Sequence, residues 1–201
     1  MSAELKQKKK LTPEEYLELE EKAEYKSEYW DGVMVPLHGE PAELAGATES
    51  HNTITLNIAV LFRIRLEDRC RTYSSEMKVR VEKKNKFYYP DVLVICGDLK
   101  FYQNRRTILE NPTIIVEVLS GSTTMKDRTE KLWAYQSLES VQEYVLVSQD
   151  KPVVEKYARR TNEEWSYSAT VGLESSVRFD SIGITLTLKE IYNLVEFEAE
   201  D

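Results

Sequence analysis

The chain has 201 residues, of which 41% are hydrophobic and 31% charged, a composition typical of a globular protein with one buried core. Its net charge of −8 argues against a nucleic-acid binder that depends on bulk positive charge, although a local cleft with a few basic side chains stays compatible with it. Two cysteines, a charged start without an apolar signal segment and no apolar run of the roughly 20 residues that cross a bilayer favour a cytoplasmic protein without membrane contact.

The chain is predicted to form a single domain. Residues 1–10 are polar and lysine-rich and are expected to be a flexible tail, and residues 197–201 form a second short tail. The domain between them, over 11–196, shows no internal repeat and no sign of a second core.

The N-terminal part of the domain carries two clear local signals. Thr12 precedes Pro13, and Glu15 completes a capping box, so a helix is predicted to begin here and run to about residue 25. An Asp-Gly pair at the centre of 28–35 predicts the turn of a β-hairpin.

The remaining elements alternate between helices and strands. The polar segment 38–50 is interpreted as a loop or flap, and Ser50 as the N-cap of a helix over 51–68. The predicted strands cover 72–82, 88–96, 113–119, 143–149, 153–159, 164–170 and 184–188, with a helix over 124–139 and a short helix ending at 196. This order predicts an α/β (α+β) fold with a mixed central β-sheet flanked by helices.

Two carboxylates stand in the nearly continuous apolar strands. Asp91 heads the strand 88–96, and Glu117 lies in the middle of 113–119. Because side chains alternate between faces, the two carboxylates can meet on one face if these strands are neighbours. Two close carboxylates repel each other unless a cation lies between them, and such oxygen ligands suit Mg²⁺, with Mn²⁺ as an alternative.

Lys131 follows on the predicted helix 124–139. Near the reacting phosphate its ammonium would stabilise developing charge. Two structural alternatives stay open: Lys131 forms a buried salt bridge with Glu117, or it pairs with Asp127 on the surface at i, i+4 spacing. Tyr135, one turn later, is placed to donate a hydrogen bond to the same region.

Two further polar residues are candidates for the site. Glu76 is expected on the polar face of the strand 72–82, where it would add a third metal ligand or simply face solvent beside Lys78 and Arg80. His51 begins the second helix and is interpreted as a phosphate contact or an acid–base group, against the alternative of a hydrogen-bonded core histidine.

The pattern of residues disfavours other chemistries. No CxxC or HExxH pattern indicates zinc, no GxSxG elbow indicates a serine hydrolase, and no glycine-rich loop indicates phosphate binding by a P-loop. A metal-dependent phosphodiester hydrolase therefore explains the carboxylates best.

The chain resembles the Uma2 family, a group of restriction-endonuclease-like proteins in the PD-(D/E)XK nuclease superfamily. The resemblance extends over roughly residues 11 to 193 and is carried by TPEEYLELE, EYWDGVMV, SHNTITLNIAVLF, YSSEMKVRV, YYPDVLVIC, PTIIVEVLSGSTTMKDRTEKLWAYQSL, VQEYVLVSQDKPVVEKYARR and GITLTLKEIY.

The resemblance implies a restriction-endonuclease-like core, homodimers and specific roles for the candidate residues. It places Asp91 and Glu117 at the metal-binding positions. The superfamily's lysine, two residues after the glutamate, is replaced here by Leu119. The resemblance implies that Lys131 supplies the ammonium from the following helix, and that Glu76 and His51 occupy further polar positions.

The predicted function is that of a Mg²⁺-dependent endonuclease that hydrolyses phosphodiester bonds of DNA. The alternative is a non-catalytic nucleic-acid-binding or protein-interaction module that retains the nuclease fold; hydrolysis of a small phosphorylated molecule is a third option that suits the acidic composition. Basic side chains around the carboxylates would favour the nuclease, and the candidates for them are Arg63, Lys78, Lys126 and Arg128.

Overall fold

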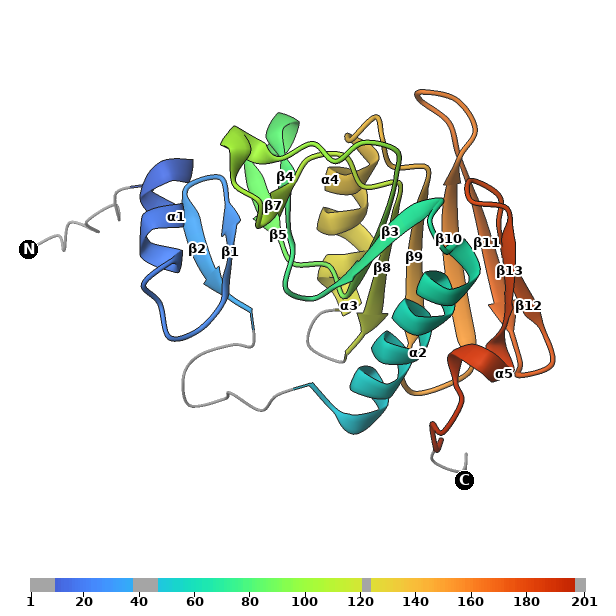
Figure 1. Cartoon of the computed structure of the whole chain (residues 1–201). Coiled ribbons are helices and arrows are strands. Elements are labelled where there is room, and N and C mark those ends of the chain that lie inside the picture. Colours follow the sequence, from blue (N-terminus) through green and yellow to red (C-terminus); the bar gives the residue numbers. More distant parts are fainter. Residues whose placement is uncertain (1–9, 38–46, 121–123, 198–201) are drawn as a thin grey trace, which may run out of the picture.

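The computed structural model describes residues 10–37, 47–120 and 124–197 (Figure 1). Nearly all of the tail expected over 1–10, and most of the flap expected over 38–50, lie outside these residues. No helix within the described residues is long and apolar enough to cross a membrane.

The N-terminal helix and hairpin form as predicted, with one correction. Helix α1 (Pro13–Glu20) begins with the Thr12 capping box. It ends about five residues earlier than expected, because residues 21–25 are exposed and bury no surface that would extend the helix. Strands β1 (Ser27–Trp30) and β2 (Val33–Pro36) pair antiparallel. Both residues of the Asp31-Gly32 turn have positive φ, as a type I′ turn requires.

The first sheet has five strands in the order β2-β1-β5-β4-β7. It lies against α1, and a small aromatic core that includes Tyr16, Tyr29 and Phe87 fills the space between them. Its other strands are β4 (Lys78–Val81), β5 (Lys86–Tyr88) and β7 (Ile108–Leu109).

The second sheet has six strands in the order β11-β10-β9-β8-β6-β3 and carries most of the hydrophobic core. It is mixed, because β8 and β9 run parallel and every other pair of neighbouring strands antiparallel. The strands are β3 (Cys70–Ser74), β6 (Val92–Cys96), β8 (Ile114–Leu119), β9 (Glu143–Ser148), β10 (Val153–Arg159) and β11 (Trp165–Val171).

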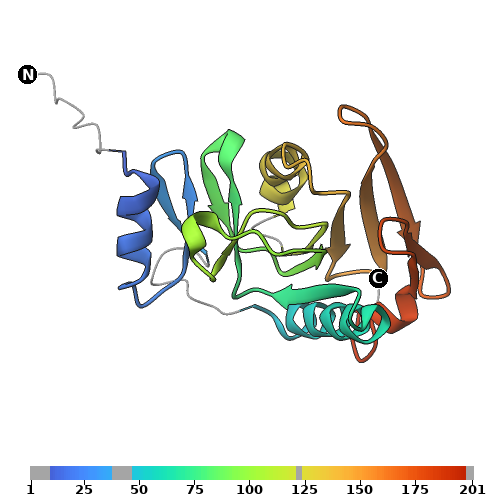
Figure 2. The same cartoon turned by 45° about the horizontal axis from the view of Figure 1, so that its top comes forward.

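Helices cover both faces of the six-stranded sheet (Figure 2). Helix α2 (Glu49–Leu66) packs on one face through Ile54, Ile58 and Phe62. Helix α4 (Leu132–Gln136) packs on the other face. The cap of α2 is Thr48, whose hydroxyl accepts the His51 amide at 3.1 Å, so the prediction of Ser50 as the cap is wrong by two residues.

The predicted mixed central sheet flanked by helices is confirmed, but the described residues also form two further sheets that the sequence did not predict. The strand expected over 72–82 is interrupted at 75–77, so β3 joins the six-stranded sheet and β4 the five-stranded one. Strand β12 (Ser176–Phe179), which was not predicted, pairs with β13 (Ile184–Thr187) in a two-stranded sheet that precedes the short helix α5 (Leu188–Ile191).

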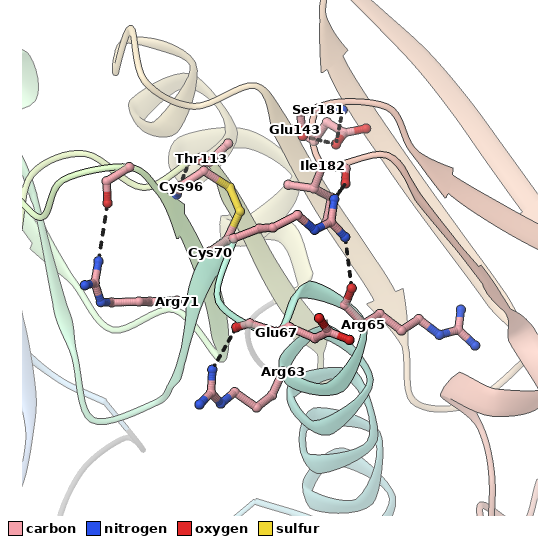
Figure 3. The surroundings of a disulfide bond; sticks show 12 residues. Arg63, Arg65, Glu67, Cys70, Arg71, Cys96, Thr113, Glu143, Ser181 and Ile182 are labelled. Carbon is pink, nitrogen blue, oxygen red and sulfur yellow. Dashed lines mark hydrogen bonds between the residues drawn. A yellow bond between two sulfur atoms is a disulfide. The ribbon is translucent and has the colours of Figure 1, made fainter.

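The two cysteines form a disulfide, although their small number favours a cytoplasmic protein (Figure 3). Cys70 and Cys96 are directly opposed on the antiparallel pair β3 and β6, with Cα atoms 4.3 Å apart. Close opposition of this kind brings two sulfur atoms within bonding reach. The cysteine count therefore no longer supports a reducing compartment.

Candidate active site

Asp91 and Glu117 meet at the edge where the two central strands diverge. Strands β6 and β8 are antiparallel with Val92 opposite Val116, so Asp91, one residue earlier, lies across from Glu117. Asp91 Oδ2 accepts the Val118 amide at 2.7 Å, which fixes the carboxylate against β8. Glu117 alternates with Ile115 and Leu119, and Asp91 with Leu93 and Ile95, residues that all belong to the core under α4, in agreement with the alternation of the sequence.

Glu117 is buried and holds two partners from the following helix. Its Oε1 lies 3.1 Å from the Lys131 ammonium and accepts the Tyr135 hydroxyl at 3.1 Å. The expected contact between Tyr135 and this region therefore exists, and its acceptor is Glu117. Leu119, two residues after Glu117, is a buried core side chain.

Lys131 lies at the centre of a buried ion-pair network. Besides Glu117, its ammonium contacts Asp127 at 3.1 Å and Glu28 at 3.7 Å, and all four side chains are at most 8% exposed. The ion pair with Asp127 has the i, i+4 spacing that the sequence indicated, but it is buried and not a surface pair. The pair with Glu117 corresponds to the buried salt bridge.

The helix expected over 124–139 is irregular at this network. It consists of α3 (Thr124–Lys126), a π-helical turn over Asp127–Lys131, and α4. A π-turn shifts the side-chain direction relative to an α-helix and often marks a functional site. Here it directs both Asp127 and Lys131 towards the sheet.

Burial and neighbouring charges set the ionisation of this network. Burial would by itself lower the pKa of Lys131, but Glu117, Glu28 and Asp127 outweigh it and raise that pKa well above its usual range. Burial raises the pKa of Glu117, and Asp127, Asp91 and Glu28 raise it further against the pull of Lys131. Lys131 is therefore a permanent cation, and the pKa of Glu117 lies well above that of an ordinary glutamate.

His51 joins the same site from the start of α2. Its Nε2 lies 3.1 Å from Asp91 Oδ1, and both side chains are 16% exposed. Figure 1 shows how α2 passes across one face of the sheet before the chain enters β3. The structure thus brings His51 to Asp91, while Lys131 reaches Glu117 from the opposite helical layer.

The structure places Glu76 elsewhere. It lies in the turn between β3 and β4, where its carboxylate is 77% exposed and bonded to Lys26. The expectation of Glu76 on a strand face fails because the strand is broken there. No contact joins Glu76 to Asp91 or Glu117 within the described residues.

Glu28 is the acidic residue that the sequence analysis missed. It is buried on β1, and besides Lys131 it accepts the Trp30 indole N–H at 3.2 Å and the Tyr89 amide at 3.4 Å. Its only sequence signal was the i, i+2 spacing to Trp30, which places the two residues on one face of the predicted hairpin.

The expected basic residues divide between the site and other parts of the surface. Arg63 donates to the Glu67 carbonyl at the end of α2, Lys78 lies 3.9 Å from Glu20, and Arg128 pairs with Glu155. Of these four, only Lys126 is near the network. Burial lowers the pKa of Lys126, and the charged groups that affect it most are Glu28, which raises it, and Lys131, which lowers it.

The sequence model of the Uma2 family, described as "Putative restriction endonuclease", matches residues 13–189. The chain belongs to the Uma2 family. Two relatives from Synechocystis sp., both named as uncharacterized proteins, support this membership. Uncharacterized protein sll1609 is 33% identical over 87% of this chain and 95% of its own length, and slr1290 is 31% identical over 94% of each.

The fold of this Uma2 chain matches a solved structure. A protein from Anabaena variabilis, described as a putative nuclease belonging to DUF820, superposes with a TM-score of 0.72 over 92% of this chain and 99% of that one. The sequence identity is 18%, so the comparison shows a shared fold.

The oxygen donors of this Uma2 site fit a hard divalent cation. No group of three His, Cys, Asp or Glu side chains within the described residues has a metal-binding arrangement. Mg²⁺ does not require one, because it commonly takes one or two carboxylates and completes its shell with water and substrate phosphate. Asp91 and Glu117, opposed on neighbouring strands, provide such a pair.

Proposed function

We propose that this Uma2 protein is a Mg²⁺-dependent endonuclease that hydrolyses phosphodiester bonds of DNA. The observation that carries the proposal is the opposition of Asp91 and Glu117 with a buried ammonium, Lys131, 3.1 Å from Glu117. Paired carboxylates with an adjacent fixed cation suit the transfer of a phosphoryl group, in which negative charge develops on oxygen. Family membership supports the same reaction class.

Asp91 and Glu117 hold the metal ion in this proposal. When bound, Mg²⁺ supplies Lewis-acid polarisation of the phosphate and lowers the pKa of a bound water. The Val118 amide keeps Asp91 oriented by its contact at 2.7 Å with Oδ2, so the carboxylate costs little reorganisation on binding. Tyr135 and Lys131 orient Glu117 in the same way.

Lys131 acts as a charge stabiliser and not as a base. Its raised pKa keeps the ammonium protonated at physiological pH, so it has no lone pair with which to abstract a proton. Three carboxylates hold the ammonium in place before the reaction begins, so the ammonium does not have to reorient when charge develops on the phosphate. This is electrostatic preorganisation.

His51 positions Asp91 and offers an acid–base group at the edge of the site. Its contact with Asp91 Oδ1 holds the second carboxylate oxygen, and its partial exposure leaves the ring open to solvent. An imidazole in this position is suited to deliver a proton to the leaving oxygen.

Calorimetric titration of Mg²⁺ and Mn²⁺ tests the site. The wild-type protein is expected to bind, and Asp91→Asn and Glu117→Gln are expected to lose most of that binding. Glu139→Gln is the matched control, because Glu139 is exposed and pairs with Lys83 at the surface. Wild-type metal binding that survives both site substitutions would contradict the assignment. Cleavage of plasmid DNA by the wild type, lost in both variants, completes the test.

The second candidate function is a non-catalytic binding module that keeps the fold. One observation favours it: Glu117 and Asp127 already have a cationic partner in Lys131, so they have a structural role that needs no metal ion. A wild-type protein that binds neither Mg²⁺ nor Mn²⁺, and that cuts no plasmid DNA, would favour this function over hydrolysis.

A further inference from the structure

Trp30 connects the candidate active site to the surface. Its indole N–H donates to Glu28 Oε2 at 3.2 Å, while Glu28 Oε1 lies 3.7 Å from the Lys131 ammonium. One carboxylate therefore links the indole ring with the buried cation. Trp30 is half-buried at the end of β1, so part of its ring remains accessible.

Two lysines from other elements gather around this ring. The Lys126 ammonium, on α3, lies 3.9 Å from the centre of the Trp30 ring, and that of Lys86, on β5, lies 5.5 Å from it. Distances below about 6 Å are those of cation–π contacts. Three segments that are far apart in sequence thus place an aromatic face and two positive charges next to Glu28 and Lys131.

The two lysines beside Trp30 differ in their charge partners. Lys86 is paired with Glu130, but Lys126 has no carboxylate within ion-pair distance in the described part of the chain. A ring face compensates an ammonium less completely than a carboxylate does. The charge of Lys126 is therefore available to an incoming anion, and a ligand that covers the ring would move the ammonium towards that anion.

We propose that Trp30, Lys126 and Lys86 form a binding site for an unpaired stretch of a DNA strand, which places the adjacent phosphodiester at Asp91 and Glu117. A base stacks on Trp30, and neighbouring phosphates contact the two lysines. Aromatic rings interleaved with lysines are the usual means of holding single strands, because every base has a face that stacks. The inference rests on the proposed nuclease function for its placement of the reacting phosphate.

The charge balance favours an unpaired strand over a duplex. In a duplex the bases stack on one another, so no base would be free to stack on the half-buried indole ring of Trp30. Duplex binding would then depend on neutralising many phosphates, which a protein with a net charge of −8 does poorly. Two lysines, of which Lys86 is paired with Glu130, predict a shallow salt dependence, with a slope of log K against log salt between roughly −0.7 and −1.4 for a single strand.

Fluorescence anisotropy with fluorescein-labelled oligo(dT) tests the site in EDTA, where cleavage does not interfere. Trp30→Ala is expected to weaken binding by roughly 5- to 150-fold, the usual effect of removing one stacked base contact. Trp30→Phe should restore most of the affinity, and Lys126→Gln should weaken binding and flatten the salt slope. The matched controls, Trp133→Ala and Lys83→Gln, alter an exposed tryptophan and an exposed lysine away from the site and should bind as the wild type does.

Three results would overturn the proposal: equal affinity for a duplex of the same length, unchanged binding by Trp30→Ala and Lys126→Gln, or an equal loss in the control variants. Lys126→Gln keeps the test informative if Trp30→Ala fails to fold, because Lys126 is a surface side chain on a short helix. If the wild-type protein binds oligo(dT) as expected but binds neither Mg²⁺ nor Mn²⁺, the proposed nuclease function is refuted and the strand-binding site stands. If the wild-type protein binds metal but not oligo(dT), the strand-binding site alone is refuted.

Discussion

The ammonium of Lys131 lies 3.1 Å from Glu117 Oε1 inside the protein, on a helix that follows the glutamate strand rather than on that strand. Asp127 and Glu28 complete its surroundings, so one cation compensates three buried carboxylates. This arrangement leaves an excess of negative charge at the point where Asp91 approaches Glu117. Such an excess favours either a retained proton or a second cation.

Replacing Lys131 with Met should reduce the free energy of unfolding by about 3–5 kcal/mol, because the buried carboxylates would lose their compensating charge. Urea denaturation measures this loss. Lys83→Met is the control, since it removes an exposed ion pair with Glu139 and should cost less than about 1 kcal/mol. Equal effects of the two substitutions would show that the network does not stabilise the fold.

The pairing of Asp91 with Glu117 could be predicted from sequence periodicity, but the burial of Glu28 beside them could not. Alternation along two apolar strands is sufficient to place Asp91 and Glu117 on one face. The burial of Glu28 depends on the pairing of β1 with β5 and on the position of the π-turn that carries Lys131. Neither feature has a local sequence signal, and charged residues beside a turn are usually exposed.

Glu28→Gln and Glu76→Gln should have different effects. Glu28 is buried against Lys131, and its neutralisation should cost about 1–3 kcal/mol of stability through loss of charged hydrogen bonds. Glu76 is exposed, so its substitution should stay within about 0.5 kcal/mol and leave Mg²⁺ affinity unchanged. Chemical denaturation and calorimetry of both variants make the comparison. Loss of metal affinity in Glu76→Gln would restore it as a third ligand.

The broken strand over 72–82 and the missed disulfide have a common physical origin. Strand β3 ends at Ser74, and the turn that follows contains no glycine or proline to mark it, while the alternating apolar residues resume at Met77. The pattern therefore predicts one strand from 72 to 82. Because that strand was expected to start after Cys70, its register opposite Cys96 was hidden, and with it the disulfide.

A reducing agent should lower the melting temperature of the protein. The disulfide closes a loop over a sequence separation of 26 residues, which corresponds to about 3.5 kcal/mol in the chain-entropy account. For a protein of this size that equals a shift of roughly 7–14 °C. Thermal unfolding with and without reductant measures it, and the Cys70→Ser, Cys96→Ser double variant should show no response. Two titratable thiols in the denatured, unreduced protein would contradict the pairing.

Acid should selectively remove one stabilising contact at the C-terminal helix. The Thr187 amide donates to Glu190 at 2.9 Å, and together with Thr187 Oγ1 and Arg65 it lowers the pKa of Glu190 below its usual value of 4.5. A carboxyl with a lowered pKa stabilises the folded state above the unfolded value, and this contribution is lost as pH falls through the folded value.

Glu190→Gln should therefore melt at a lower temperature than the wild type at pH 7, and the difference should shrink as the pH is lowered below 4.5. Thermal unfolding across this range measures the difference. Glu163→Gln, at an exposed turn, is the control and should follow the wild type at every pH. If the difference in melting temperature between Glu190→Gln and the wild type stayed constant as the pH was lowered below 4.5, the contact would not depend on the charge of Glu190. The capping box at Thr187 would then act through hydrogen bonds alone.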